Sequence, residues 1–168
     1  MRRTAELGLL LAAALILSYV ESLIPFSFGV PGMKLGLPNL VVLLLLYKDT
    51  SAGFFSKGAR EALLVNGMRI ILSGFLFSNL YAILYALAGA ALSFFAMLAG
   101  KKTKRLSMAG VSVLGGVFHN VGQVLVATAV VESFAAAYYL PYLVIAGVVT
   151  GALLGAVGME LLPYLPIE

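Results

Sequence analysis

The sequence has few of the residues on which metal centres and many enzymes depend. Its 168 residues include no cysteine, no tryptophan and one histidine. The absence of cysteine excludes disulfide scaffolds, thiol nucleophiles and cysteine metal sites, and one histidine without a group of carboxylates leaves a metal coordination sphere incomplete. We therefore expect no metal site and no cofactor.

Residues that handle phosphates are also missing. No GxxxxGK[ST] loop is present, so this chain does not cradle ATP in the usual way. Asp49 is the only aspartate, whereas metal-dependent diphosphate chemistry needs several carboxylates around Mg²⁺. The residues argue against an enzyme, including a self-sufficient prenyltransferase, and favour binding and transport.

Charge is scarce and apolar residues dominate. Charged residues make up 11% of the chain and hydrophobic residues 62%, whereas a soluble domain has about 25% and about 45–50%. Because too little polar surface remains to face water, the composition predicts a multi-pass protein of the cytoplasmic membrane, surrounded by lipid. The net charge of +4 does not imply a nucleic-acid partner, since in membrane proteins the position of each basic residue matters more than the total.

Six apolar runs predict transmembrane helices, because a bilayer core of about 30 Å takes about 20 apolar residues as a helix. The second run is short and contains Pro38, which is tolerated in a first turn but bends a helix interior. We place the start of that helix at about Pro38 and expect a thin or tilted span. The sequence thus predicts an all-α bundle, one domain over residues 1–168, with helices over 5–23, 35–47, 60–78, 80–100, 107–131 and 141–162.

The distribution of basic residues favours six spans with both termini in the cytoplasm. If the short run did not cross, the basic stretch 101–105 would lie outside, against the positive-inside rule. The positive-inside rule does not account for two basic residues: Lys34 in the outer loop and Arg69 within a span. Residues 18–21 offer no small-x-small site, so no signal cleavage is expected. Six spans place nine of the 11 basic residues inside: Arg2, Arg3, Lys48, Lys57, Arg60, Lys101, Lys102, Lys104 and Arg105.

Arg69 and Asn66 are three residues apart in the third run and share one helix face. A guanidinium at mid-span costs at least about 2.5–3.5 kcal/mol on insertion scales, so such a residue usually has a partner or a function. Two interpretations are open. Arg69 either pairs with Glu21 or Glu132 to fix helix packing, or it anchors a carboxylate or phosphate of a ligand.

The fifth run contains GGVFHNVGQ over 115–123. His119 and Gln123 are four residues apart and Asn120 lies beside them, so hydrogen-bonding groups can point into one cavity. The glycines of this stretch let a ligand or a neighbouring helix approach the backbone. Hydrogen bonding between helices, without any ligand, is the alternative.

The segment GVPGMKLGLPN over 29–39 is predicted to be a loop by its Gly and Pro content, yet it is unusually apolar. Irregular backbone at membrane depth is tolerated where it lines a cavity or is packed in protein. The segment is therefore either a lid over an outward-facing site, with Lys34 and Asn39 contributing to that site, or a passive outer turn.

Gly8 and Ala12, in the first run, have the small-xxx-small spacing that lets helices approach closely. This face either binds a partner helix or packs within the molecule. The pattern itself does not distinguish the two interpretations.

Three motifs together resemble one family over nearly the whole chain. They are PGMKLGLPN at 31–39, NGMRIILSG at 66–74 followed by LFSNL at 76–80, and GVSVLGGVFHNVGQ at 110–123. These motifs resemble the Gx transporter family, whose members are often labelled heptaprenyl diphosphate synthase component I. Members of that family resemble the substrate-binding S components of energy-coupling factor (ECF) transporters.

The resemblance implies a six-helix membrane subunit that captures a small vitamin-like, isoprenoid- or quinone-related molecule. Such a subunit docks on an ECF coupling protein driven by two cytosolic ATPases, and its first helix, here at Gly8 and Ala12, meets that coupling protein. Two alanines four residues apart, which are typical of that helix, are not present here. The expected substrate-binding residues are Lys34, Asn39, Asn66, Arg69, His119, Asn120 and Gln123.

A second hypothesis follows from the label of the family. The chain would be a membrane accessory subunit of polyprenyl diphosphate synthesis, with another chain holding the Mg²⁺. Lys101, Lys102, Lys104 and Arg105 would then face a diphosphate, although a solvated loop that only sets topology explains them as well. A scaffold whose polar residues only pack helices is the third hypothesis.

Overall fold

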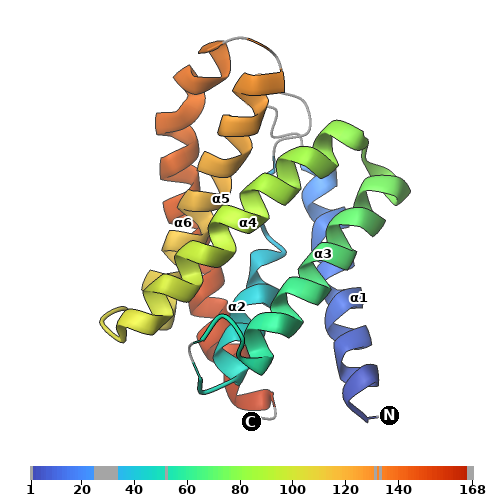
Figure 1. The fold of residues 1–168 in the computed structure, drawn as a ribbon, viewed down its shortest axis with the longest axis vertical. Coiled ribbons are helices and arrows are strands. Elements are labelled where there is room, and N and C mark those ends of the chain that lie inside the picture. The colour runs from blue at the N-terminus through green and yellow to red at the C-terminus, as the bar shows by residue number, and fades with distance from the viewer. Residues whose placement is uncertain (1, 25–33, 52, 131, 133, 166–168) are drawn as a thin grey trace.

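A computed structural model describes residues 2–24, 34–51, 53–130, 132 and 134–165. These residues form six α-helices and two short 3₁₀ helices without any β-strand, so the predicted all-α class is confirmed (Figure 1). That residues 1–168 form one domain stays a prediction. The α-helices are α1 Arg2–Leu23, α2 Asn39–Lys48, α3 Lys57–Phe77, α4 Leu80–Thr103, α5 Met108–Val130 and α6 Leu140–Leu161, and the 3₁₀ helices are η1 Phe134–Tyr139 and η2 Leu162–Tyr164.

The predicted helices agree with the observed ones, but several ends were wrong by three residues. α1 and α3 begin three residues earlier than predicted, and α4 ends three residues later. Charged residues at these ends interrupt the apolar run without interrupting the helix, because long basic side chains reach out to the membrane interface. The two 3₁₀ helices were not predicted, and the predicted end of the fifth helix at Val131 lies outside the described residues.

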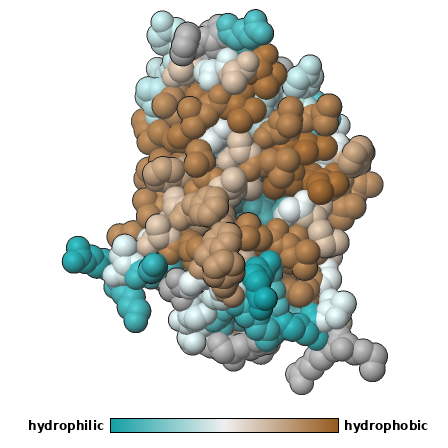
Figure 2. Space-filling view, in the orientation of Figure 1, coloured by the Kyte–Doolittle hydropathy of each residue, from teal (hydrophilic) through white to brown (hydrophobic). Residues whose placement is uncertain are grey.

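Within the described residues, four stretches are long and apolar enough to cross a membrane: Arg3–Leu23, Leu80–Thr103, Met108–Val130 and Ala137–Tyr164. They support the prediction of a membrane protein, and Figure 2 shows hydrophobic surface over the middle of the molecule with hydrophilic surface gathered toward its ends. α3 has a similar length but carries several charges. Crossing by α2 and α3, and the cytoplasmic side of both termini, stay predictions.

α2 is the core of the bundle rather than a lipid-facing helix. Nine of its ten residues are buried, and it contacts α1, α3, α4, α5 and α6. A helix that is apolar all round belongs in an interior. Its ten residues reach about 15 Å, half of a bilayer core of about 30 Å. The expected thin span is therefore a half-length helix enclosed by the other five.

The other helices form two groups around α2. α5 packs most extensively against α4 and α6, whereas α1 packs on α3 (Figure 1). The start of α1, the end of α6 and the α2–α3 and α4–α5 turns lie at the same end of the molecule. That end is the predicted cytoplasmic end, and the α3–α4 turn and η1 lie toward the other.

Close helix packing between α5 and α6 depends on small residues. A Cβ at Gly147 would lie 2.8 Å from the carbonyl carbon and oxygen of Gly116. Gly151 and Gly155 continue this contact at four-residue spacing, against Val113 and Ala109. This small-xxx-small pattern lets the two backbones touch. It was visible in the sequence but did not enter the prediction.

Gly147→Ala should destabilise the protein. The added methyl meets backbone, which cannot move aside as a flexible side chain can, so the expected cost is about 1–3 kcal/mol. Thermal unfolding in detergent, followed by far-UV circular dichroism, measures it. Gly67→Ala is the control, because a Cβ there has nothing within 4 Å and helix propensity predicts a gain of about 0.5–1 kcal/mol. Equal stability of Gly147→Ala and wild type would contradict the packing described here.

Candidate functional site

Gln123 of α5 binds the backbone of Lys34 through both of its amide groups. Its Oε1 accepts from the Lys34 N–H at 2.8 Å, and its Nε2 donates to the Lys34 C=O at 2.9 Å. The same Nε2 lies 2.5 Å from His119 Nε2, one turn earlier on α5. Because the glutamine nitrogen only donates, His119 Nε2 accepts, and this network assigns a neutral imidazole with its proton on Nδ1.

Glu21 holds the next residues of the same non-helical segment. Its Oε1 accepts from the N–H groups of Gly36 at 2.5 Å and Leu37 at 3.0 Å. Gly36 has a φ of 87°, which favours glycine. A Cβ there would lie 2.9 Å from both Asn39 Nδ2 and His119 Cδ2. Two helices far apart in the sequence thus fix this segment, and Gly36 lets Asn39 and His119 lie against it.

Arg69 lies on α3 and is 3% exposed. Its Nη2 donates to Asn66 Oδ1 at 2.5 Å, so the predicted shared face is confirmed. Its Nε has no hydrogen-bond partner among the described residues. Of the two carboxylates considered as partners, Glu21 interacts electrostatically with Arg69, and Glu132 is exposed. The hydrogen-bond donors of the buried Arg69 guanidinium are therefore only partly paired.

The side chain of Lys34 extends toward the end of α3. Its Nζ donates to Ser78 Oγ at 2.9 Å and lies 5.8 Å from the centroid of the Phe77 ring. The pKa of Lys34 is lowered. Burial is the main cause and the charge of Arg69 adds to it, whereas the charge of Glu21 opposes the shift. Residues 29–33 of the predicted lid lie outside the described residues, so its closure over a site stays a prediction.

The two remaining asparagines differ in their contacts. Asn120 Nδ2 donates to the Leu143 C=O of α6 at 2.6 Å, which is the contact between helices that was considered as an alternative. Asn39 is 5% exposed, and both of its amide atoms lack a partner within the described ranges. Six of the seven predicted ligand residues thus lie together. With one further residue they form the interior polar cluster: Glu21, Lys34, Asn39, Asn66, Arg69, His119 and Gln123.

Sequence reasoning missed Glu21 as a member of this cluster. The sequence suggests Glu21 only as a possible ion-pair partner of Arg69. In the structure Glu21 lies in the last turn of α1, which ends at Leu23 as predicted, and Glu21 is 5% exposed. The available signal was an acidic residue within the last turn of an apolar run, where burial is costly unless the carboxylate accepts hydrogen bonds.

The interior polar cluster has groups that suit an anion or an amide better than a metal ion. Two basic side chains, Lys34 and Arg69, face one carboxylate, Glu21. In the described part of the chain, no three His, Cys, Asp or Glu residues gather to hold a metal. Guanidinium groups bind carboxylates and phosphates, and an asparagine amide both donates and accepts.

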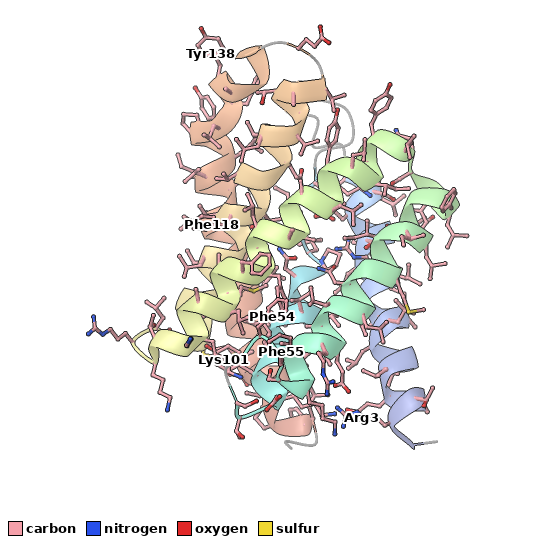
Figure 3. All side chains as sticks on the ribbon, viewed as in Figure 1. Arg3, Phe54, Phe55, Lys101, Phe118 and Tyr138 are labelled. Carbon is pink, nitrogen blue, oxygen red and sulfur yellow. The ribbon has the colours of Figure 1, made fainter. Side chains whose placement is uncertain are left out.

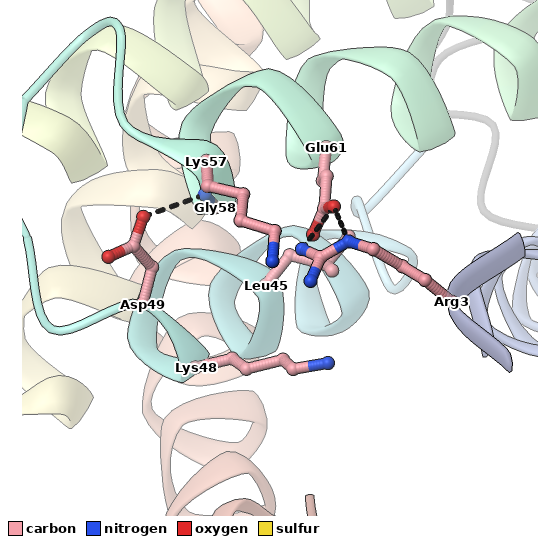
Figure 4. A pocket seen from close by; sticks show the side chains of 7 residues that line it. All are labelled: Arg3, Leu45, Lys48, Asp49, Lys57, Gly58 and Glu61. Atoms are coloured by element: carbon pink, nitrogen blue, oxygen red, sulfur yellow. Dashed lines mark hydrogen bonds and ion pairs between the residues drawn. The ribbon is translucent and has the colours of Figure 1, made fainter. Parts of the chain in front are cut away.

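A second polar site lies where α1, α2 and α3 meet at the predicted cytoplasmic end (Figure 4). Arg3 Nε donates to Glu61 Oε1 at 2.5 Å, and Lys48 forms an ion pair with Glu6. These pairs join α1 to both other helices. This charged pocket has a volume of about 100 Å³ and is lined by Arg3, Leu45, Lys48, Asp49, Lys57, Gly58 and Glu61.

Asp49 fixes the start of α3 beside this charged pocket. Its Oδ2 accepts from the Gly58 N–H at 2.8 Å, and its Oδ1 accepts from the N–H and hydroxyl of Ser51. Burial raises the pKa of Asp49, but the hydrogen bonds from Gly58 and Ser51, with the charge of Lys101, lower it to about 2. The carboxylate thus complements the N-terminus of α3, which is a structural role.

Gly8 and Ala12 lie on an exposed face of α1. Both residues are exposed, as is Ile16 one turn further on, and a Cβ at Gly8 would have nothing within 4 Å. These residues do not pack against other helices in the described part of the chain. Contact with a partner helix stays a prediction.

Gln123→Leu should release the segment that begins at Lys34. Leucine has a similar size but leaves the Lys34 N–H and C=O without partners, at about 1–3 kcal/mol each. We expect at least tenfold faster amide exchange of Lys34, measured by hydrogen–deuterium exchange. Thr128→Val is the control, because among the described residues the Thr128 hydroxyl bonds only to the Leu125 carbonyl of its own helix. Unchanged exchange in Gln123→Leu would show that other contacts hold the segment.

Comparison with known families supports the resemblance found in the motifs. The family described as "Heptaprenyl diphosphate synthase component I" matches residues 10–161, which include the whole interior polar cluster. No curated protein and no solved structure matches the chain. The expected family label is confirmed, and the chain belongs to the heptaprenyl diphosphate synthase component I family.

Proposed function

We propose that the chain is the substrate-binding membrane subunit of an ECF-type importer, and that its ligand occupies the interior polar cluster. One observation carries this proposal. Arg69 Nε and both amide atoms of Asn39 are buried without hydrogen-bond partners in the described structure. A buried polar atom left unpaired costs about 1–3 kcal/mol, so a bound molecule that supplies partners would account for both side chains.

The chemistry of the cluster limits the kinds of ligand that it can bind. Arg69 already donates to Asn66, and its free Nε is suited to a carboxylate or phosphate oxygen. The basic residues outnumber the single acidic residue by one, so a ligand with one negative charge balances the cluster. Asn39 would bind a neighbouring carbonyl or amide of the same molecule. A small vitamin-like, isoprenoid- or quinone-related anion meets these conditions.

The exposed face of α1 at Gly8 and Ala12 is the proposed contact with the coupling protein. Small residues permit close approach of a partner helix, and the two residues are not used for packing inside the described structure. Two cytosolic ATPases would then drive the assembly, since this chain has no phosphate-binding loop of its own.

A second function is favoured by the family description. It names one component of a synthase, which implies a partner component, and the chain would then be the membrane accessory subunit of polyprenyl diphosphate synthesis. Affinity purification from native membranes separates the two readings. Recovery of ATPase subunits supports import, and recovery of a soluble Asp-rich synthase supports the accessory role.

Arg69→Ala and His119→Ala should each lose the ligand. Loss of a charge-assisted hydrogen bond of about 1.5–3 kcal/mol predicts an occupancy reduced about tenfold or more. Native mass spectrometry of the purified chain measures the retained small molecule. Ser73→Ala is the matched control, because Ser73 lies one turn after Arg69 and its hydroxyl, in the part of the chain that the structure describes, bonds only to the Ile70 carbonyl of its own helix. Retention by both alanine variants at the wild-type level would refute the assignment of the site.

Ala12→Phe should weaken assembly without changing the ligand. The bulky ring prevents close approach of a helix at this exposed face, so we expect several-fold less co-purified ATPase with unchanged small-molecule occupancy. Ala91→Phe is the control, because Ala91 is exposed on α4, away from α1. Equal recovery of ATPases with Ala12→Phe and wild type would place the contact elsewhere.

A further inference from the structure

An apolar groove follows the outer side of α4 and α5 near their shared turn. It has a volume of about 400 Å³, and nearly all of its lining is apolar. Phe95 is 53% and Phe118 is 40% exposed, so the groove opens to the surface of the molecule. Phe118 is labelled in Figure 3. The residues that matter here are Leu92, Phe95, Ala96 and Ala99 on α4, with Leu114 and Phe118 on α5.

The length of the groove matches one leaflet of a bilayer. Along α4 its lining runs from Leu92 to Thr103, which is about 16 Å at about 1.5 Å per residue. Half of a hydrocarbon core is about 15 Å. A single extended acyl chain would therefore lie along α4 within the predicted cytoplasmic leaflet.

Three exposed basic residues lie where the groove ends. Lys102, Lys104 and Arg105 are exposed, and no carboxylate of the described residues pairs with them. Lys104 closes α4, since its N–H donates to the Lys101 carbonyl. The chain then turns back at once. The turn thereby keeps the basic residues beside Thr103 and Leu106, which both line the groove.

Lys101 differs from these three residues. Its Nζ donates to the carbonyls of Leu46, Asp49 and Ser51 at 2.5, 2.5 and 2.6 Å. Figure 3 shows it close to the α2–α3 turn. Lys101 therefore connects α4 to that turn, and only the other three basic residues are available to a ligand.

We propose that the groove binds one anionic phospholipid of the cytoplasmic leaflet. An acyl chain lies along α4, and the headgroup phosphate contacts Lys102, Lys104 and Arg105. Each basic residue near an anionic membrane surface strengthens binding by roughly fivefold. Topology alone requires basic residues in this turn but gives no reason for an apolar groove that leads to them. This lipid site is independent of the interior polar cluster.

Native mass spectrometry of the full chain in detergent, titrated with dioleoyl phosphatidylglycerol or dioleoyl phosphatidylcholine, tests the proposal. Wild type should retain one phosphatidylglycerol at least tenfold more tightly than phosphatidylcholine. The triple variant Lys102→Gln, Lys104→Gln and Arg105→Gln should lose at least tenfold in phosphatidylglycerol affinity and keep its weak binding of phosphatidylcholine. The single variant Arg105→Gln, with an expected loss of several-fold, gives the same test with less disturbance of the turn.

Two matched controls separate the groove from general charge and size effects. Arg60→Gln removes an exposed charge at the start of α3 and should leave lipid binding unchanged. Ala99→Phe fills the groove and should weaken both lipids, whereas Ala91→Phe, outside the lining, should not.

Three outcomes would overturn the proposal. The first is unchanged phosphatidylglycerol binding in the triple and single variants. The second is an equal loss of binding in Arg60→Gln. The third is displacement of phosphatidylglycerol by geranylgeranyl diphosphate at an equal or lower concentration, which would make a prenyl diphosphate the occupant.

Discussion

The paired hydrogen bonds between the Gln123 side chain and the Lys34 backbone are the contact on which the interior depends. A non-helical segment inside an apolar bundle has N–H and C=O groups that neither lipid nor its own chain satisfies. Gln123 satisfies both groups of Lys34, and Glu21 accepts from the N–H groups of Gly36 and Leu37, two and three residues further on. With its backbone satisfied in this way, the chain can enter the bundle and begin α2 there.

The position of α2 follows from this entry. Because the helix starts inside the bundle, its ten residues are enclosed on all sides, and an apolar surface all round is the stable solution. The same entry carries Lys34 and Asn39 to the side chains of α3 and α5.

The two polar sites of the molecule differ in how far their charged groups are paired. At the predicted cytoplasmic end the carboxylates of Glu6 and Glu61 have ion-pair partners, whereas the interior polar cluster retains unpaired atoms. Buried unpaired atoms need an explanation, and in this cluster they lie on basic and amide side chains that a ligand could bind.

Much of the fold was predictable because it depends on local properties of the chain. Apolar length places helices, and the helical period puts Asn66 and Arg69 on one face. Helix ends were less predictable, since charged residues such as Lys57 and Lys101 extend a helix beyond its apolar run. Asn120 shows a different limit. Its neighbours His119 and Gln123 lie in the cluster, but its own amide donates to α6, and sequence spacing did not indicate that direction.

The sequence by itself determined the membrane character, the places of the helices and the set of polar residues that need an explanation. Those properties follow from hydrophobicity and from contacts within three or four residues. Only the tertiary structure decided the partners: Gln123 reaches a segment 89 residues away, and Glu21 belongs to the cluster because α1 passes beside that segment. Hydrogen bonds act over about 3 Å, so the pairing of distant groups depends on how the helices pack, which no local pattern specifies.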